Sequence, residues 1–231
     1  MYGLKILIRK DINMEDKDIY LNTLKNLDNV LWIIQYGSST QGIKDFKDID
    51  YMVVVKDNFD LHGVGRKIIG NYDFNFYTLS QFNTMMLNND ISCLEAYVCE
   101  DKYYVKGDRI PLKINPDKVR EQCAKVSSNS WVKAKKKLTI DKDYNPYIAL
   151  KSLYHSMRIL ALGTNILGSK EFDLELYYYE CIEIYRLVFE RENCGWEKLD
   201  DFFREFYNKS RSCLRASHKK ALREGCVGYE V

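Results

Sequence analysis

The stretch YGSSTQGIKDFKDID, residues 36–50, decides how this chain is interpreted. It leaves an apolar run, turns on Gly37 and Ser38, and enters a second apolar run that opens with Asp48 and Asp50. The pattern predicts two strands joined by a turn of small and polar residues. Two interpretations are open at this point. The segment is either a surface turn with acidic side chains or one half of a site for metal ions and phosphate.

The two aspartates are expected to lie on one face of their strand. Successive side chains of a strand point to opposite faces, so Asp48 and Asp50 share a face, with Cα atoms about 6.6 Å apart. Ile49 then points into the core. Two such carboxylates can converge on a pair of divalent cations, which lie about 3.5–4 Å apart in two-metal sites. Mg²⁺ prefers oxygen ligands and leaves room for substrate phosphates, so we expect two Mg²⁺ ions, or Mn²⁺ in their place.

The turn at Gly37, Ser38 and Ser39 has the composition of a phosphate-binding loop. Glycine lets the backbone approach a ligand closely, and backbone N–H groups and serine hydroxyls can hold phosphate oxygens. A third acid, Asp73, lies in an alternating, aromatic-rich run at 71–79, which predicts another strand. If that strand pairs beside the strand of the first two aspartates, Asp73 becomes the third metal ligand and the general base. The alternative is that Asp73 is a solvated residue at a strand edge.

The rest of the chain predicts an α+β protein in two parts. Residues 1–115 contain strand and helix patterns, which we expect to form a small mixed sheet with helices. After Pro116 the strand signals disappear, and amphipathic stretches predict a helical domain over 116–231. The expected strands lie at 3–9, 30–36, 48–55 and 71–79, and the expected helices at 15–27, 80–87, 117–138, 146–167, 173–192 and 196–222.

This order of residues resembles the DNA polymerase β-like nucleotidyltransferase superfamily. The family signature is a Gly-Ser pair, a short spacer, two aspartates around a hydrophobic residue, and a third aspartate on a later strand. The matching residues of this chain are Gly37, Ser38, Asp48, Asp50 and Asp73. The likeness is closer to bacterial and phage-encoded nucleotidyltransferases associated with RNA repair. Gly42 matches a second glycine of that pattern, whereas Lys47 stands where the pattern usually has a serine.

The resemblance extends over most of residues 30–168. The segment DFNFYTLSQFNTMMLNNDISCLEAYV is similar to a family block of an aspartate, a strand and a helix, and YHSMRILALGTNIL is similar to the family's His-x-x-Arg-Leu-Leu helix. The resemblance implies a small sheet followed by a helical domain that closes a nucleotide cleft. It also implies that an acceptor hydroxyl attacks the α-phosphate of an NTP and releases pyrophosphate, with two Mg²⁺ ions stabilising the charge.

A polar stripe in the second half is a candidate for binding the nucleotide. Lys151, His155 and Arg158 lie at i, i+4 and i+7, so they share one face of the expected helix. That face is either a cleft wall that contacts triphosphate oxygens or a solvated surface opposite the apolar Leu153 and Met157. The resemblance to the family's His-x-x-Arg helix favours nucleotide binding.

Composition limits the class of protein and its location. The chain has 231 residues, of which 46% are hydrophobic, and a net charge of +2, as in soluble globular proteins. No apolar run approaches the roughly 18 residues of a membrane span, and the first residues do not resemble a secretory signal. Seven scattered cysteines without a CxxC pair predict reduced thiols. We therefore expect a cytoplasmic protein that does not bind membranes.

Together these features predict a metal-dependent nucleotidyltransferase that moves a nucleoside monophosphate from an NTP to an acceptor hydroxyl. RNA, such as a tRNA 3′ end, is the expected acceptor, because residues 116–231 carry a surplus of Lys and Arg that is concentrated at 204–223. A protein or small-molecule hydroxyl is the alternative acceptor. The alternative functions are a non-catalytic nucleotide-binding component of a toxin–antitoxin pair and a pure RNA-binding module. Three acids facing a polyanion argue against the latter.

Overall fold

The computed structural model describes residues 17–41, 43, 48–59, 65–98, 103–105 and 113–226. The chain divides into two compact units, Met1–Leu112 and Lys113–Val231, each of which is described by itself. The strand expected at 3–9 lies outside the described residues, as do Gly42 and Lys47 of the turn.

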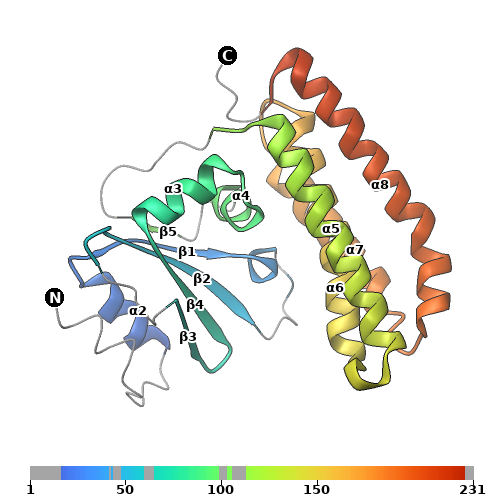
Figure 1. Ribbon diagram of the computed structural model, residues 1–231, viewed down its shortest axis with the longest axis horizontal. Coiled ribbons are helices and arrows are strands. Elements are labelled where there is room, and N and C mark those ends of the chain that lie inside the picture. The colour runs from blue at the N-terminus through green and yellow to red at the C-terminus, as the bar shows by residue number, and fades with distance from the viewer. Residues whose placement is uncertain are drawn as a thin grey trace. The chain divides into compact units, whose positions relative to one another are not determined.

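The first unit is built on a five-stranded mixed sheet with the strand order β3-β4-β2-β1-β5 (Figure 1). β2 and β4 run parallel, whereas the other neighbouring strands are antiparallel. The small mixed sheet expected from the sequence is therefore confirmed. The strands are β1 Val30–Tyr36, β2 Ile49–Val55, β3 Arg66–Ile69, β4 Tyr72–Thr78 and β5 Tyr103–Val105.

Helices cover both faces of this sheet because its central strands are apolar on both sides. On one face, α2 (Lys17–Lys25) packs Leu24 into a core with Ile33, Val53 and Phe74. On the other face lie α3 (Leu79–Leu87) and α4 (Ile91–Val98). Phe82 of α3 packs on Trp32 with the ring centroids 5.2 Å apart. Side chains alternate along a strand, so Trp32 and Ile33 serve opposite faces.

The start of α3 is fixed by a double set of caps directly after β4. Thr78 accepts from the backbone N–H of Gln81, and the Gln81 side chain accepts from the backbone N–H of Thr78, which is a capping box. Asp57 accepts hydrogen bonds from both the backbone N–H and the hydroxyl of Ser80, at 2.7 and 2.8 Å. These bonds lower the pKa of Asp57. The junction between β4 and α3 is therefore stabilised both by the capping box and by the hydrogen bonds to Asp57.

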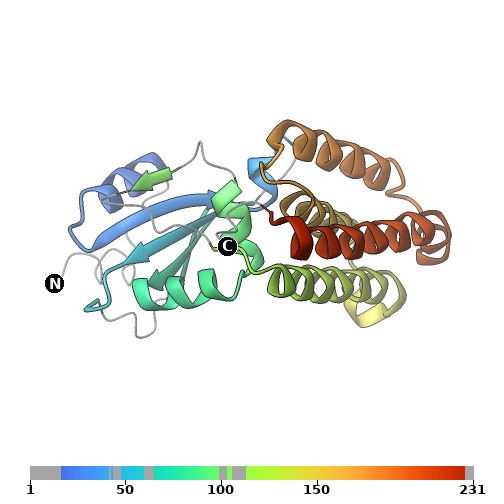
Figure 2. The ribbon, with the colours of Figure 1, turned by 90° about the horizontal axis from the view of Figure 1, so that it is seen from above.

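The second unit is a bundle of four long helices (Figure 2). The amide or carboxylate side chain of an N-cap residue opens three of them, namely Asn115, Asn145 and Asp173. The central helix is α6, whose side chains are mostly buried because it contacts each of the other three. The helices are α5 Pro116–Thr139, α6 Pro146–Gly168, α7 Leu174–Phe189 and α8 Trp196–Glu224, with a 3-10 turn at Asp141–Asp143 between α5 and α6.

Gly163 lets α6 approach two neighbours at once. A Cβ atom on this residue would lie 2.6 Å from Sγ of Cys123 on α5 and 2.9 Å from Cδ1 of Leu214 on α8. The four-helix arrangement expected from the amphipathic stretches is confirmed in each of these elements. None of the helices in the described ranges has an apolar stretch long enough to cross a bilayer.

Candidate active site

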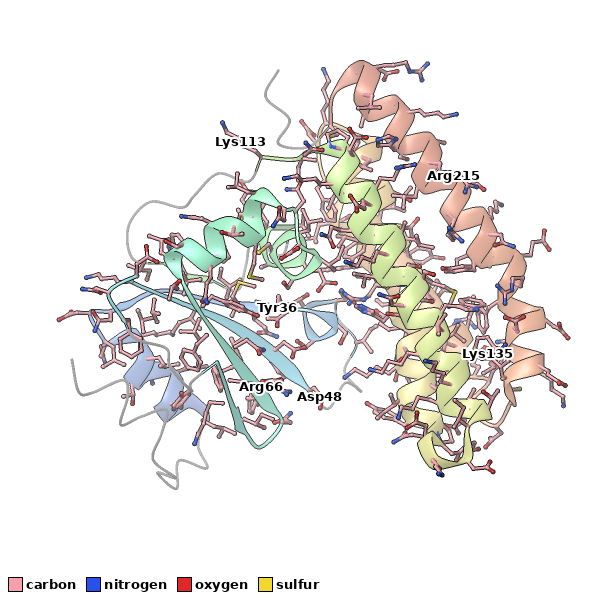
Figure 3. The ribbon with its side chains drawn as sticks, in the orientation of Figure 1. Tyr36, Asp48, Arg66, Lys113, Lys135 and Arg215 are labelled. Atoms are coloured by element: carbon pink, nitrogen blue, oxygen red, sulfur yellow. The ribbon has the colours of Figure 1, made fainter. Side chains whose placement is uncertain are left out.

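Two of the three predicted aspartates lie in a row of ladder partners that crosses three strands. Tyr36, at the end of β1, pairs with Asp50 of β2, and Asp50 pairs in turn with Asp73 of β4. Paired residues on neighbouring strands point to the same face, and such strands are about 4.8 Å apart. The end of β1 and the starts of β2 and β4 therefore meet at one end of the sheet, where Tyr36 and Asp48 are labelled in Figure 3.

Gly37 keeps space open beside Asp50. Its backbone has φ 81° and ψ −163°, a conformation that only glycine adopts readily. A Cβ atom on residue 37 would lie 3.1 Å from Oδ2 of Asp50. Any side chain at this position would therefore press against the carboxylate, and only glycine lets the main chain pass so close to Asp50.

The turn after Gly37 is a compact 3-10 helix, η1 (Ser38–Thr40). The Thr40 hydroxyl donates to the carbonyl of Gly37 at 2.7 Å, and Gln35 donates from Nε2 to the hydroxyl of Ser39 at 3.2 Å. Ser38 is buried and Ser39 is half-buried. The first backbone N–H groups of a helical turn have no acceptor inside the turn. The predicted phosphate-binding residues thus lie in a hydrogen-bonded turn next to Asp50.

The same face of the sheet gathers further acidic and phenolic groups. Asn75 of β4 donates from Nδ2 to the Tyr36 hydroxyl at 3.3 Å. Burial raises the pKa of Tyr36, and the charge of Asp50 adds to the shift, with smaller effects from Glu95 and Asp73. Tyr36 therefore stays protonated, and its surroundings are negative. Glu95, on α4, is buried, and its charge is one of those that raise the pKa of Tyr36.

Arg66 of β3 binds the third aspartate. Its Nε donates to both carboxylate oxygens of Asp73, at 2.8 and 2.9 Å, and its Nη2 donates to Oδ2. Hydrogen bonding to Asp73 raises the pKa of Arg66. The Asp73 side chain is 14% exposed, whereas that of Arg66 is 61% exposed. The ion pair therefore joins the half-buried carboxylate of Asp73 to the mostly exposed side chain of Arg66.

The arrangement fits divalent cations in part. Asp48 lies one residue before β2 begins and is exposed, so the strand start is one residue later than predicted. In the part of the chain that the structure describes, no group of three or more His, Cys, Asp or Glu side chains is arranged to hold a metal ion. Asp48 and Asp50 have the right chemistry, and Gly37 leaves room beside Asp50. Asp73 fits a metal only when Arg66 has moved away.

The predicted polar stripe belongs to α6 of the second unit, and its members differ in burial. Arg158 is 2% exposed and is among the largest fully buried side chains of the described residues. Its Nη2 lies 2.8 Å from Nδ1 of His155. A guanidinium can only donate, so Nδ1 accepts and the imidazole is neutral with its proton on Nε2. Burial lowers the pKa of His155 to about 3, and the charge of Arg158 adds to the shift.

Sequence reasoning did not single out Arg66, Tyr36 or Asn75 as site residues. Arg66 lies in a strand of four residues, two of them charged, which carries no strand pattern that could be recognised. Asn75 could have been found, because it lies two residues after Asp73 in an alternating strand and must share its face.

Comparisons with known proteins give one weak structural match and no family. A scan against protein-family models finds no match. A search of curated proteins finds none either. Among solved structures, the chain is similar to the crystal structure of a nucleotidyltransferase-like protein from Exiguobacterium sibiricum 255-15. The match has 13% identity and a TM-score of 0.29, and it covers 90% of this chain and 75% of the other.

Proposed function

We propose that the protein is a metal-dependent nucleotidyltransferase that moves a nucleoside monophosphate from an NTP to an acceptor hydroxyl. The observation that carries this proposal is the row from Tyr36 through Asp50 to Asp73, with Gly37 leaving space against Oδ2 of Asp50. A plain surface hairpin does not require a glycine-only backbone conformation at the point where a carboxylate approaches the main chain.

The roles of the residues follow from where they lie. The loop at Gly37, Ser38 and Ser39 would hold phosphate oxygens through backbone N–H groups and hydroxyls. Asp48 and Asp50 would hold Mg²⁺, which when bound draws negative charge away from the reacting phosphate. In the reaction the acceptor oxygen bonds to the α-phosphorus, the bond to the β-phosphate oxygen breaks, and pyrophosphate leaves. The hydroxyl proton would pass to Asp73, which requires that Arg66 release it.

RNA is the proposed acceptor, with a protein or small-molecule hydroxyl as the alternative. The site is acidic, so a polyanionic acceptor needs positive charge elsewhere to hold it. The second unit contains that charge, concentrated along α8.

The test is transfer of label from each α-labelled NTP, with Mg²⁺, to cellular RNA, protein or metabolites. We expect label in the RNA fraction, and we expect Asp48→Asn and Asp50→Asn to lower transfer at least about a hundredfold. The matched control is Asp28→Asn, an exposed aspartate away from the row, which should keep full activity. Full transfer by Asp50→Asn would overturn the assignment of the site.

A second function is favoured by one observation, the pairing of Arg66 with Asp73. If the guanidinium stays in place, the third acid cannot serve as base or ligand, and the protein binds nucleotide without turning it over. Stabilisation of the fold by NTP with Mg²⁺, in the absence of any labelled product, would support this candidate.

A further inference from the structure

A second polar site lies in the helical unit, between α5 and α8. A cavity of about 360 Å³ opens there, within the range of ligand-binding pockets. Arg120 comes from α5, and Arg211 and Arg215 come from one face of α8, since residues at i and i+4 lie one above the other. The acidic side chains that line the cavity are Asp117 and Glu121 of α5.

The three arginines of this cavity are not neutralised by those acids. Arg215 donates to the Ser212 hydroxyl at 2.8 Å, and Arg211 lies over the ring of Tyr207 at 5.8 Å from its centroid. Across residues 113–226, none of the three guanidinium groups forms an ion pair. Asp117 is instead 2.8 Å from Nε2 of His218.

Other exposed arginines of the same unit show the contrast. Arg186 forms ion pairs with Glu183 and Glu190, and Arg204 forms one with Asp200. Arg211 and Arg215 have no carboxylate one helical turn away in the sequence, and Arg120 does not pair with Asp117, which lies three residues before it and contacts His218. The cavity instead concentrates positive charge, although two carboxylates line it.

We propose that this cavity binds a phosphate group of an RNA strand. Arginine guanidinium groups recognise phosphate with paired hydrogen bonds, and three of them around one cavity give more donors than a single phosphate needs. The volume leaves room for the sugar on either side of the phosphate. The choice of an RNA strand rests on the proposed function, whereas phosphate binding by the cavity does not.

The structure also narrows which basic residues of α8 take part. Lys220 donates from Nζ to the carbonyl of Gly168 at 2.7 Å, so it caps the C-terminus of α6. Arg211 and Arg215, together with Arg120, are therefore the residues to test. Arg215 is labelled on α8 in Figure 3.

The experiment measures binding of a fluorescein-labelled RNA of twenty nucleotides by anisotropy, in EDTA and without NTP, from low to high KCl. Arg211→Gln with Arg215→Gln should weaken binding at least about tenfold. It should also flatten the slope of log Kd against log salt by about 0.7, the contribution of the one phosphate that the cavity neutralises. Arg120→Gln alone should flatten the slope by less than about 0.7, because Arg211 and Arg215 still contact the phosphate. The matched control, Lys198→Gln with Arg223→Gln, removes the same charge from α8 outside the cavity and should leave the slope nearly unchanged.

Each result has a defined meaning. Equal losses in the control and in the arginine variants would show a diffuse electrostatic effect and overturn the cavity site. Pyrophosphate that binds as tightly as the RNA at matched ionic strength would overturn the choice of an RNA strand. The variant Asp50→Asn, which should lose nucleotidyl transfer, should bind the RNA at least as tightly as the unmodified protein, since it removes a negative charge, so failure of nucleotidyl transfer and failure of the cavity site are distinguishable. Circular dichroism and melting temperature confirm that each variant is folded.

Discussion

Arg66 holds both carboxylate oxygens of Asp73, on the strand next to the Asp50 strand. A guanidinium in this position puts a positive charge where the metal-site interpretation needs a cation. Because the Arg66 side chain is mostly exposed, it can swing into solvent without disturbing the core. Arg66 would therefore have to leave before the Asp73 carboxylate could contact a cation.

The first prediction concerns this competition. Arg66→Gln should tighten Mn²⁺ binding by about two- to fivefold, a small effect because the ion pair is exposed and such pairs are weak. Direct binding is measured by the electron paramagnetic resonance signal of free Mn²⁺, with Lys67→Gln on the same strand as control. Unchanged Mn²⁺ affinity in Arg66→Gln would show that Asp73 does not take part in metal binding.

The second prediction concerns Gly37. Gly37→Ala should lower the free energy of unfolding by about 1–3 kcal/mol, since the backbone conformation strongly disfavours other residues. It should also lower nucleotidyl transfer, because the new methyl group would press on Asp50. Urea denaturation measures the first effect. Gly65→Ala, where a Cβ meets no atom within 4 Å, is the control and should change stability little.

The third prediction is a pH dependence from His155. The folded protein holds the pKa of this imidazole near 3, whereas the unfolded chain has the ordinary value near 6.5. Between these values the unfolded chain binds a proton that the folded chain does not. The free energy of unfolding should therefore be fully retained above pH 6.5 and fall as pH drops, by up to about 1.4 kcal/mol per pH unit.

The variant His155→Asn tests the origin of that slope, since its amide oxygen can still accept from Arg158 but does not titrate. Between pH 7 and 5, unfolding by urea should depend less on pH in the variant. Identical slopes in both proteins would mean that His155 is protonated in the folded state. Lys133 and Lys151 also favour the neutral imidazole, so substituting either should raise its pKa slightly.

The fourth prediction compares two glycines of α6. Alanine is normally the better residue inside a helix, yet Gly163→Ala should destabilise the bundle by about 1–3 kcal/mol because it overpacks against Cys123 and Leu214. At Gly168 a Cβ would make only ordinary contact with the Ser217 hydroxyl, at 3.4 Å. Gly168→Ala should therefore be neutral or stabilising. The same sign for both substitutions in chemical denaturation would contradict the close approach of the helices.

The strands and helices that could be predicted are those in which the spacing of apolar residues indicates only one kind of element. Val30–Tyr36 is recognisable as a strand because it is a short and mostly apolar run, and the bundle helices because their apolar residues recur with helical spacing. The helix α4 (Ile91–Val98) was not predicted. It is short and buried on most sides, so it has no polar face from which helical spacing can be recognised.

The site shows the same limit. The ladder from Asp50 to Asp73 follows from strand alternation once the two strands pair, and that pairing was stated as a condition. The contact of Arg66 with Asp73 could not be predicted. Arg66 lies on β3, which pairs with the strand of Asp73, and the sequence did not indicate that β3 is a strand. Arg158 was assigned to a polar stripe, since spacing gives the face of a helix but not whether that face is covered.

The parallel pairing of β2 with β4 has a consequence for how the protein is made. Parallel neighbours cannot be joined by a tight hairpin, and β3 lies between β2 and β4 in the sequence, so Asp50 and Asp73 meet through a non-local strand pairing. The helical unit depends mainly on contacts between successive helices, which are close in sequence and form quickly, whereas non-local strand pairing is slow. We expect the carboxylate row to be among the last parts of its unit to assemble. A full-length chain that refolds from denaturant would then hold an ordered helical bundle before the carboxylate row has formed.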